Sequence, residues 1–430
     1  MSPAIILTIG FVGFLVLGVP VAIAMGMVAI LSMLPSGMPL SYVVQSAYSA
    51  VNDFTIIAVP MFILAGALME KGGLTERLII FSRALVGPAP GGLATVTILA
   101  CTMFAAISGS GPATTAAIGS IMIPAMIKEY KDRGFSSAIT ASAGGIGVVI
   151  PPSIPIIIYG ITSETSITAL FVAGVIPGLM LALALYLTVL VISKKRGFVA
   201  QNTSKRDVSE IWRTAKEAKW SLFAPVIILG GIYLGVFTVT EASIVAVYYA
   251  LFVGVLVHKA IKLPTFIDSL TYTARVAGTV MLVLVTGRVV GRLLSMYQIP
   301  QQVSSLMLST FSDPITLILV IVALLIFVGM WMETLTQIII LTPLLLPVAI
   351  GIDIHPIQFG IMFVIACEIG YSTPPLGVNL FVASEIGETT IEKVSWASLP
   401  FIGAEMVVLL LVAFVPQFSL ALPELLGLIR

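Results

Sequence analysis

The sequence predicts an all-α polytopic membrane protein with two inverted repeats, about ten transmembrane helices and two re-entrant hairpins. Three observations predict this fold: an apolar composition, basic residues confined to a few connections, and a recurring pattern of proline and glycine. Hydrophobic residues make up 59% of the 430 residues and charged residues 10%, whereas about 25% of a typical soluble domain is charged. Because such a chain has too little polar surface to cover itself in water, most of it must lie in lipid.

The composition also excludes several classes of function. A net charge of +1 does not fit a nucleic-acid-binding surface. Cys101 and Cys367 lie in apolar runs, so no disulfide framework is expected, and His258 and His355 are isolated. No Ser/His/Asp or histidine-metal constellation is visible, so we do not expect an enzyme. Met1 is followed by Ser-Pro and an apolar run without a basic segment, so we expect no cleaved signal peptide.

Apolar runs of roughly the length of a membrane span, about 20 residues, predict the helices. The runs are 4–18, 20–34, 54–69, 138–160, 168–193, 219–238, 240–259, 275–297, 357–383 and 393–420. The first two are short and can instead form one long helix bent at Pro20. Two further apolar stretches, 90–127 and 314–350, are interrupted by polar residues near their middle. Each can form two close-packed spans or a re-entrant hairpin whose turn stops inside the membrane.

The distribution of positive charge decides between these two possibilities. Lys and Arg gather in 70–89, 128–136, 194–219 and 259–262 and at Lys393, whereas 35–53, 161–167, 298–313 and 351–356 contain none. By the positive-inside rule, the first group is cytoplasmic and the second lies across the membrane. Each interrupted stretch must then leave and return on the same side. Both are therefore predicted to be hairpins, in opposite orientations.

A shift of 223 residues superimposes the two halves of the sequence. It carries Phe104 onto Phe327, Pro124 onto Pro347, Gly147 onto Gly370, Pro151 and Pro152 onto Pro374 and Pro375, and Pro177 onto Pro400. Each half contains three spans, a hairpin and two spans, which is an odd number of crossings, so the second half must be inserted upside down. We expect repeats at 1–193 and 219–430 and a cytoplasmic connector at 194–218. Inverted repeats are typical of secondary transporters, which bind their substrates near the midplane.

Amphipathic segments and broken helices add detail to this repeat. Segment 74–88 should lie along the cytoplasmic surface of the membrane and 299–313 along the opposite surface. The paired prolines predict breaks within 138–160 and 357–383, because each proline lacks an N–H and bars the preceding residue from helical geometry. The carbonyl groups that such breaks free must face protein, water or a cation.

The hairpin turns offer further oxygen atoms at a similar depth. These are the hydroxyl and backbone oxygens of Ser108, Gly109 and Ser110 in the first turn, and of Thr334 and Thr336 in the second. Oxygen ligands without a dense carboxylate cluster suit Na⁺ better than Ca²⁺. The alternative is that these hydroxyls only pack and bond to neighbouring helices. Helix N-termini after the turns and breaks suit an anionic substrate group.

Charged residues inside the predicted spans are few. They are Arg288, Arg292, Glu333 and Glu368. Charges at this depth are costly and are usually either paired or functional. These residues can either form a structural Arg–Glu pair or take part in binding an anion. None of the four has a charged counterpart in the first half of the chain, as expected if the ligands do not follow the repeat.

Three motifs resemble the large membrane subunit of tripartite ATP-independent periplasmic (TRAP) transporters, the DctM-like family. They are Ser108-Gly-Ser-Gly-Pro-Ala-Thr-Thr, Gly147-Val-Val-Ile-Pro-Pro-Ser and Gly370-Tyr-Ser-Thr-Pro-Pro-Leu-Gly-Val-Asn. The resemblance implies a Na⁺-driven elevator in the bacterial inner membrane that imports organic acids, chiefly C4-dicarboxylates and sialic acids. It implies two partners, a small DctQ-like membrane subunit and a soluble DctP-like periplasmic binding protein. Because this chain begins at the large subunit, we expect the small subunit to be separate.

The resemblance also suggests roles for individual residues. It implies a first ion site at Ser108, Gly109, Ser110, Gly147, Val148 and Pro151, and a second at Thr334, Thr336, Gly370, Ser372 and Thr373. We add Thr114, Ser153, Asn379 and Arg292 as hypotheses for contacts with the substrate. A proton-coupled carrier that uses Glu333 and Glu368 is the nearest alternative. A channel-like pore is less favoured, because channels are usually symmetric around a conduction axis.

Overall fold

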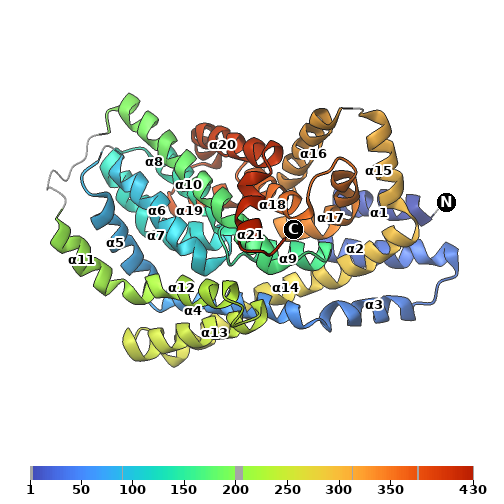
Figure 1. Ribbon diagram of the computed structural model, residues 1–430, viewed down its shortest axis with the longest axis horizontal. Coiled ribbons are helices and arrows are strands. Elements are labelled where there is room, and N and C mark those ends of the chain that lie inside the picture. Colours follow the sequence, from blue (N-terminus) through green and yellow to red (C-terminus); the bar gives the residue numbers. More distant parts are fainter. Residues whose placement is uncertain (1–2, 90, 199–206, 312, 375–376, 430) are drawn as a thin grey trace.

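The computed structural model describes residues 3–89, 91–198, 207–311, 313–374 and 377–429, and the described chain folds into helices without strands. The helices form an elongated bundle (Figure 1). Five of them are long and apolar enough to cross a membrane: Phe54–Lys71, Ile167–Arg196, Val239–Val257, Leu263–Met296 and Ile391–Phe414. Other apolar helices are shorter, because breaks and turns interrupt them. The chain is thus an all-helical protein of membrane-like composition, as the sequence predicts.

The first half begins with five helices. They are α1 (Pro3–Val16), α2 (Val21–Met33), α3 (Ser41–Val51), α4 (Ala58–Lys71) and α5 (Leu74–Val86). The N-terminal apolar run therefore forms two helices rather than one bent helix. Gly18 adopts a positive φ of 75° and Pro20 precedes α2, so the chain reverses there and α1 packs against α2. The amphipathic segment 74–88 forms α5, as expected.

Two of the predicted boundaries need correction, one in each half of the chain. Segment 35–53, expected to be only a connection, contains α3, and the span expected at 275–297 is the end of α14 (Leu263–Met296). Pro264 occupies the first turn of α14, where its missing N–H costs nothing. The first turns of α14 are rich in polar residues, so hydropathy does not reveal them. Helix α14 packs against α2, α3 and α4.

Hairpins follow in both halves of the chain. The first consists of α6 (Gly92–Ser108) and α7 (Gly111–Tyr130), and the second of α16 (Pro314–Gly329) and α17 (Thr334–Ile350). Each is followed by an interrupted helix. In the first half this is α8 (Arg133–Gly145), a short 3₁₀ turn at Ile146–Val148 and α9 (Ile154–Ser163); in the second it is α18 (Pro356–Tyr371) and α19 (Val378–Ile386). Pro375 of the second break lies outside the described residues.

A long helix, α10 (Ile167–Arg196) or α20 (Ile391–Phe414), follows the interrupted helix in each half. The span expected at 393–420 is wrong at its C-terminal end, because α20 stops at Phe414 and α21 (Gln417–Leu425) follows. Val415 is extended, with φ −122° and ψ 91°, as the residue before Pro416 must be. Helix α21 packs against α10 and α18.

Helix boundaries recur at the spacing of the sequence repeat. The shift of 223 residues carries Gly111 and Arg133, which begin α7 and α8, onto Thr334 and Pro356, which begin α17 and α18. Helix packing recurs as well: α7 contacts α19 while α17 contacts α9, and α4 contacts α13 (Val239–Leu251) while α14 contacts α2. Helix α15 (Ile299–Thr310) corresponds to α5. That the second copy runs upside down stays a prediction.

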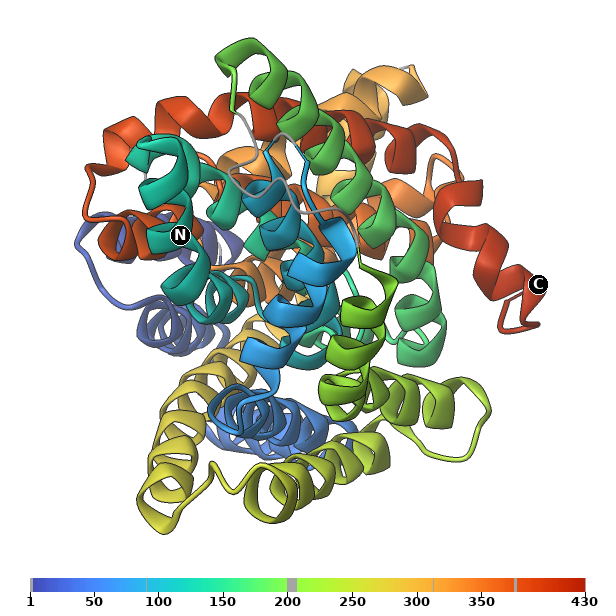
Figure 2. The ribbon, with the colours of Figure 1, turned by 90° about the vertical axis from the view of Figure 1, so that its left-hand side faces the viewer.

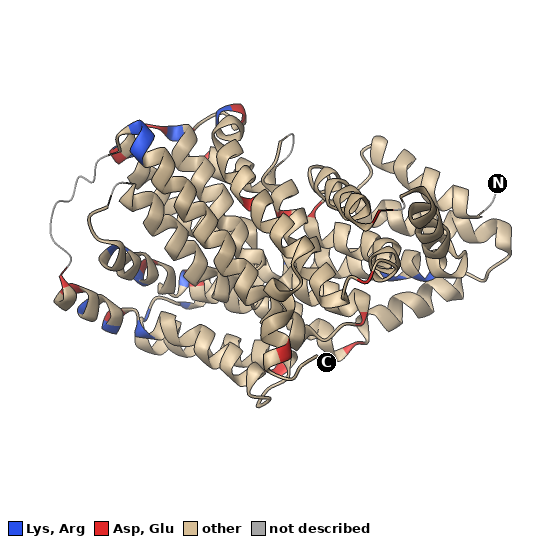
Figure 3. Cartoon of the chain, turned by 45° about the horizontal axis from the view of Figure 1, so that its top comes forward, with Lys and Arg blue, Asp and Glu red and all other residues tan. Residues whose placement is uncertain are grey.

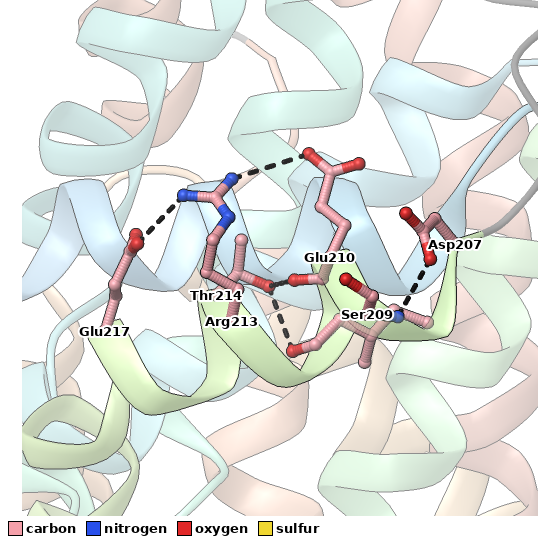
Figure 4. Close-up of polar contacts among 7 residues, drawn as sticks. Asp207, Ser209, Glu210, Arg213, Thr214 and Glu217 are labelled. Atoms are coloured by element: carbon pink, nitrogen blue, oxygen red, sulfur yellow. Dashed lines mark hydrogen bonds and ion pairs between the residues drawn. The ribbon is translucent and has the colours of Figure 1, made fainter.

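The connector between the halves contains helix α11 (Val208–Glu217), which leads into α12 (Lys219–Tyr233). Residues 199–206 of the connector lie outside the described residues. Asp207 caps α11 by accepting a hydrogen bond from Ser209 N at 2.9 Å, and Arg213 pairs with Glu217 at 2.9 Å and with Glu210 at 3.7 Å (Figure 4). Helix α11 lies beside α5 (Figure 2). These exposed pairs contribute little stability, so packing on α5 must position the helix.

Basic residues gather at the end of the molecule that holds α5, α11 and the start of α8 (Figure 3). Arg196 at the end of α10 forms an ion pair with Asp132, and Arg133 pairs with Glu388 at 3.2 Å. The basic connections around residues 132 and 196 therefore meet in space. This meeting agrees with the prediction that both lie on the cytoplasmic side.

The opposite orientation of the repeats can be tested by labelling from each face of the membrane. Lys128→Cys and Asp353→Cys place one exposed thiol in each half, and the native Cys101 and Cys367 are fully buried. We expect a membrane-impermeant maleimide to label Asp353→Cys in intact cells and Lys128→Cys only after permeabilisation. Labelling of both thiols from one compartment would overturn the inverted repeat.

Candidate functional site

Both hairpin turns and both helix breaks line one cavity of about 110 Å³. The first half contributes Gly109, Ser110, Gly111, Pro112, Val148, Ile154 and Pro155, and the second contributes Glu333, Thr334, Leu335, Glu368 and Tyr371. Ile63 of α4 and Val276 and Val280 of α14 close the remaining side with apolar surface. The structure thus brings Gly109, Ser110, Val148 and Thr334 to the same place, although they come from distant parts of the chain.

The first turn holds a compact cluster of oxygen atoms beside this cavity. Thr114 Oγ1 donates to the carbonyl oxygen of Ser110 at 2.8 Å and lies 2.8 Å from Ser108 Oγ. Ser108 Oγ donates to the same carbonyl at 3.1 Å. Gly147 packs directly on the cluster, because a Cβ there would lie 2.6 Å from Thr114 Oγ1 and 3.0 Å from the carbonyl oxygen of Ser110. The predicted residues of the first set therefore lie together.

The first break is bonded to the first turn through the backbone. Ile154 N donates to the carbonyl oxygen of Gly109 at 3.2 Å. Ser153 begins α9 as its N-cap, accepting from Ile156 N at 3.3 Å and donating to the carbonyl oxygen of Val148. The peptide bond between Pro151 and Pro152 is cis. Because the hydroxyl of Ser153 is engaged in the cap, this residue supports the break rather than lining the cavity.

The second set of predicted residues is arranged less compactly. Thr336 Oγ1 donates to Glu333 Oε2 at 3.3 Å, while the buried Thr334 Oγ1 has no hydrogen-bond partner among the described residues. Thr373 Oγ1 bonds back to the carbonyl oxygen of Ile369. Gly370 lies against Gly329, where a Cβ on Gly370 would come within 2.7 Å of the Gly329 Cα. Glycine at both positions lets the backbones of α16 and α18 meet.

Glu368 connects the second break to the first turn and the first break. Its Oε1 accepts a hydrogen bond from Asn379 Nδ2, which lies 3.5 Å from Ser372 Oγ. A Cβ on Gly111 would lie 2.9 Å from Oε1, and one on Gly145 would lie 2.8 Å from it. Gly111 begins α7, so the carboxylate faces the positive end of that helix dipole. Asn379 lies at the site itself, beside both Glu368 and Gly111, where a Cβ would come within 3.3 Å of its Nδ2.

Sequence reasoning missed one buried carboxyl group near this site. Glu405 of α20 is only 5% exposed and lies within electrostatic reach of Glu368. Glu405 Oε2 and Glu368 Oε2 both lack a hydrogen-bond partner in the described part of the chain. No proline or glycine motif marks Glu405. The available signal was a lone carboxyl group in the middle of an apolar helix, which is typical of a functional position.

Arg292 lies away from the turns. Its Nη1 donates to Ser46 Oγ of α3 at 3.1 Å, and it lines a second, larger cavity together with Arg288. The hypothesised substrate contact of Arg292 would therefore lie in this second cavity rather than in the cavity at the turns.

Comparison with known proteins identifies the family. Residues 8–418 match the model of the tripartite ATP-independent periplasmic transporter, DctM component. The chain belongs to this family. It is 38% identical to the sialic acid TRAP transporter large permease protein SiaM of Vibrio cholerae over 97% of both chains. It is 37% identical to the C4-dicarboxylate TRAP transporter large permease protein DctM of the same organism over 96% of both.

Two further matches concern domain composition and fold. The chain is 42% identical to the isethionate TRAP transporter permease protein DctMQ of Oleidesulfovibrio alaskensis, covering 95% of this chain but 65% of that relative. The solved structure of the Alcanivorax borkumensis YdaH transporter shares the fold, with a TM-score of 0.67 and 14% identity, covering 89% of this chain and 90% of that one. The TRAP large component described here is thus a multi-pass protein of the bacterial inner membrane whose relatives are permeases.

Gly147→Ala tests the packing of the first break on the first turn. The added methyl group must displace Thr114 or Ser110, so we expect a loss of about 1–3 kcal/mol in stability and a lower midpoint of thermal unfolding in detergent. Gly278→Ala is the control, since a Cβ at Gly278 meets nothing within 4 Å. Equal midpoints for the two variants would contradict the close approach.

Proposed function

We propose that this large component imports an organic acid in symport with Na⁺ by an elevator movement. Its partners are a small DctQ-like membrane subunit and a periplasmic DctP-like binding protein. The observation that carries the proposal is the single cavity lined by both turns and both breaks. The relatives' names mention sialic acid, C4-dicarboxylates and isethionate, which are all organic anions. An organic acid is therefore the substrate class that we propose.

Oxygen atoms beside the cavity support Na⁺ as the coupling ion. Ser108, Ser110 and Thr114 present hydroxyl and carbonyl oxygens within hydrogen-bond distance of one another. In the second half, Thr334 Oγ1 is buried without a partner among the described residues. A buried hydroxyl group without a partner is unfavourable, and a bound cation would satisfy it. Weakly charged oxygen ligands of this kind suit a monovalent cation.

Charge at the cavity gives a physical reason for coupling. Helices α7 and α17 begin at the cavity, so their positive ends favour a substrate carboxylate or sulfonate. Glu333 and Glu368 line the same cavity, and their carboxylates, when ionised, repel such an anion. Cations bound at the two turns would offset that repulsion. The anion would then bind well only when Na⁺ is present.

Helix packing supports an elevator rather than a fixed pore. Helices α2, α4, α13 and α14 pack on one another, and the hairpins and broken helices pack together as α7 with α19 and α17 with α9. The two groups meet at the cavity through Ile63, Val276 and Val280. Apolar surface can slide without breaking hydrogen bonds. We propose that α2, α4, α13 and α14 form the frame and that the hairpins carry the substrate.

Uptake into proteoliposomes that contain both partner proteins tests the coupling. We expect uptake of at least one acid from a panel of isethionate, sialic acid and C4-dicarboxylates, and we expect it to require Na⁺. Thr114→Val should raise the Na⁺ concentration for half-maximal uptake by about tenfold, because it removes one oxygen of the first cluster. Thr102→Val is the matched control, since among the described residues its hydroxyl bonds only to the carbonyl oxygen of Ile98 in the same helix. Undiminished uptake in Na⁺-free buffer would reject the coupling.

A proton-coupled carrier is the second candidate, and the buried pair of Glu368 and Glu405 favours it. Both carboxyl groups are at most 5% exposed, and each has an oxygen without a partner in the described chain. Glu333 also faces this region, and Tyr371 lies within electrostatic reach of Glu333 and Glu368. Buried carboxyl groups within membrane-spanning segments are typical of proton relays. Such a pair could release and rebind a proton during transport.

A Na⁺ gradient and a pH gradient, applied in separate experiments, distinguish Na⁺ coupling from proton coupling. With Na⁺ coupling, we expect a Na⁺ gradient at equal pH to drive uptake and a pH gradient in Na⁺-free buffer to drive none. Glu405→Gln keeps the shape of the side chain and should retain Na⁺-driven uptake. Uptake driven by pH alone, and abolished by Glu405→Gln, would instead establish proton coupling.

A further inference from the structure

A second cavity of about 560 Å³ lies beyond the cavity at the turns. Its walls include α3 on one side and α9, α14 and α17 on the other; α3 runs along the edge of the bundle and packs against α14 (Figure 1). Nothing in the family match or in the names of the relatives assigns a role to it. Its volume is sufficient for a small organic molecule.

The two cavities follow one another along the same three helices. On α14 the lining passes from Val280 to Leu284, and on α17 from Leu335 to Ile339. On α9 it passes from Pro155 to Ile161. Four residues are about one helical turn, or roughly 6 Å. The larger cavity therefore adjoins the cavity at the turns.

Two arginines give the larger cavity a positive interior wall. Arg288 and Arg292 are four residues apart on α14, so they lie on one face of the helix. Arg292 donates to Ser46 Oγ at 3.1 Å, and neither arginine has a carboxylate within 4 Å among the described residues. The cavity's acidic residues, Asp53 and Glu164, are both exposed. Two partly buried guanidinium groups without a carboxylate partner form a site for an anion.

We propose that this cavity, the vestibule, binds the anionic group of an organic acid before the acid reaches the turns. Arg288 and Arg292 hold the carboxylate or sulfonate, because a guanidinium group donates two parallel hydrogen bonds to either anion. The carboxylates of Asp53 and Glu164 lie at the exposed edge and repel the anion, so the anion is favoured at the interior wall, beside the arginines. The proposal rests on the proposed transport of organic acids and adds the route by which they enter.

Thiol labelling tests the vestibule without any transport measurement. Ser49→Cys on α3 and Thr162→Cys on α9 place a thiol on opposite walls. Each is treated with an anionic methanethiosulfonate that carries a sulfonate and with a cationic one that carries trimethylammonium. Ser309→Cys, which is exposed on α15 outside the vestibule, corrects for the intrinsic reactivity of the reagents. The native Cys101 and Cys367 are fully buried, so the parent chain gives the background.

The anionic reagent should react faster than the cationic one at both vestibule thiols. The double variant Arg288→Gln with Arg292→Gln should lower the ratio of the anionic to the cationic labelling rate by roughly threefold to tenfold, because the focused positive potential is lost. Arg275→Gln, on the exposed start of the same helix, should leave the ratio unchanged. Arg288→Lys with Arg292→Lys should preserve most of it, which separates the effect of charge from any change in folding.

An unchanged ratio in the double glutamine variant would overturn the vestibule, even if Na⁺-dependent uptake succeeds. A lowered ratio supports it, even if no acid in the uptake panel is transported, in which case the transport proposal alone fails. Isethionate, added as a free anion, should slow labelling by the anionic reagent at Ser49→Cys and not at Ser309→Cys. Equal slowing at both positions would also count against a site at the arginines.

Discussion

The carboxylate of Glu368 contacts three separate parts of the chain: the segment after the second break, the first turn and the first break. It accepts a hydrogen bond from Asn379, which lies beyond the second break. It also lies against Gly111, which follows the first turn, and against Gly145, which precedes the first break. Backbone groups freed by a broken helix cannot be left facing lipid, so the breaks must be buried in protein. The contact of Glu368 with two glycines keeps them buried together. The cavity at the turns exists because these four elements meet there.

The cavity and the vestibule share the walls of α9, α14 and α17 but differ in charge. Carboxylates of Glu333 and Glu368 lie at the first, and guanidinium groups of Arg288 and Arg292 at the second. An anion would therefore be attracted to the vestibule by charge and would need accompanying cations at the turns. Because these arginines and glutamates line separate cavities, they form no ion pair with one another in the described part of the chain.

Local chemistry explains which features could be predicted from the sequence. The adjacent prolines at Pro151 and Pro152 end a helix wherever they stand, and the glycine and serine residues between α6 and α7 favour a turn. Helix α3 and the first turns of α14 could not be predicted in the same way, because their residues are too polar for hydropathy to mark them as part of a span. Glu405 carries only a weak sequence signal, a lone carboxyl group in an apolar helix, and its position near Glu368 is visible only in the structure.

The sequence by itself determined that the chain is a membrane protein, where its helices break and which family its motifs resemble. Each of these follows from covalent geometry or from composition within a short segment, which neighbours in space do not alter. Only the tertiary structure decided that both turns and both breaks line one cavity, and that Arg292 lies in a second cavity beside Arg288. Such contacts join residues far apart in the chain, and they depend on how whole helices pack, which no local pattern specifies.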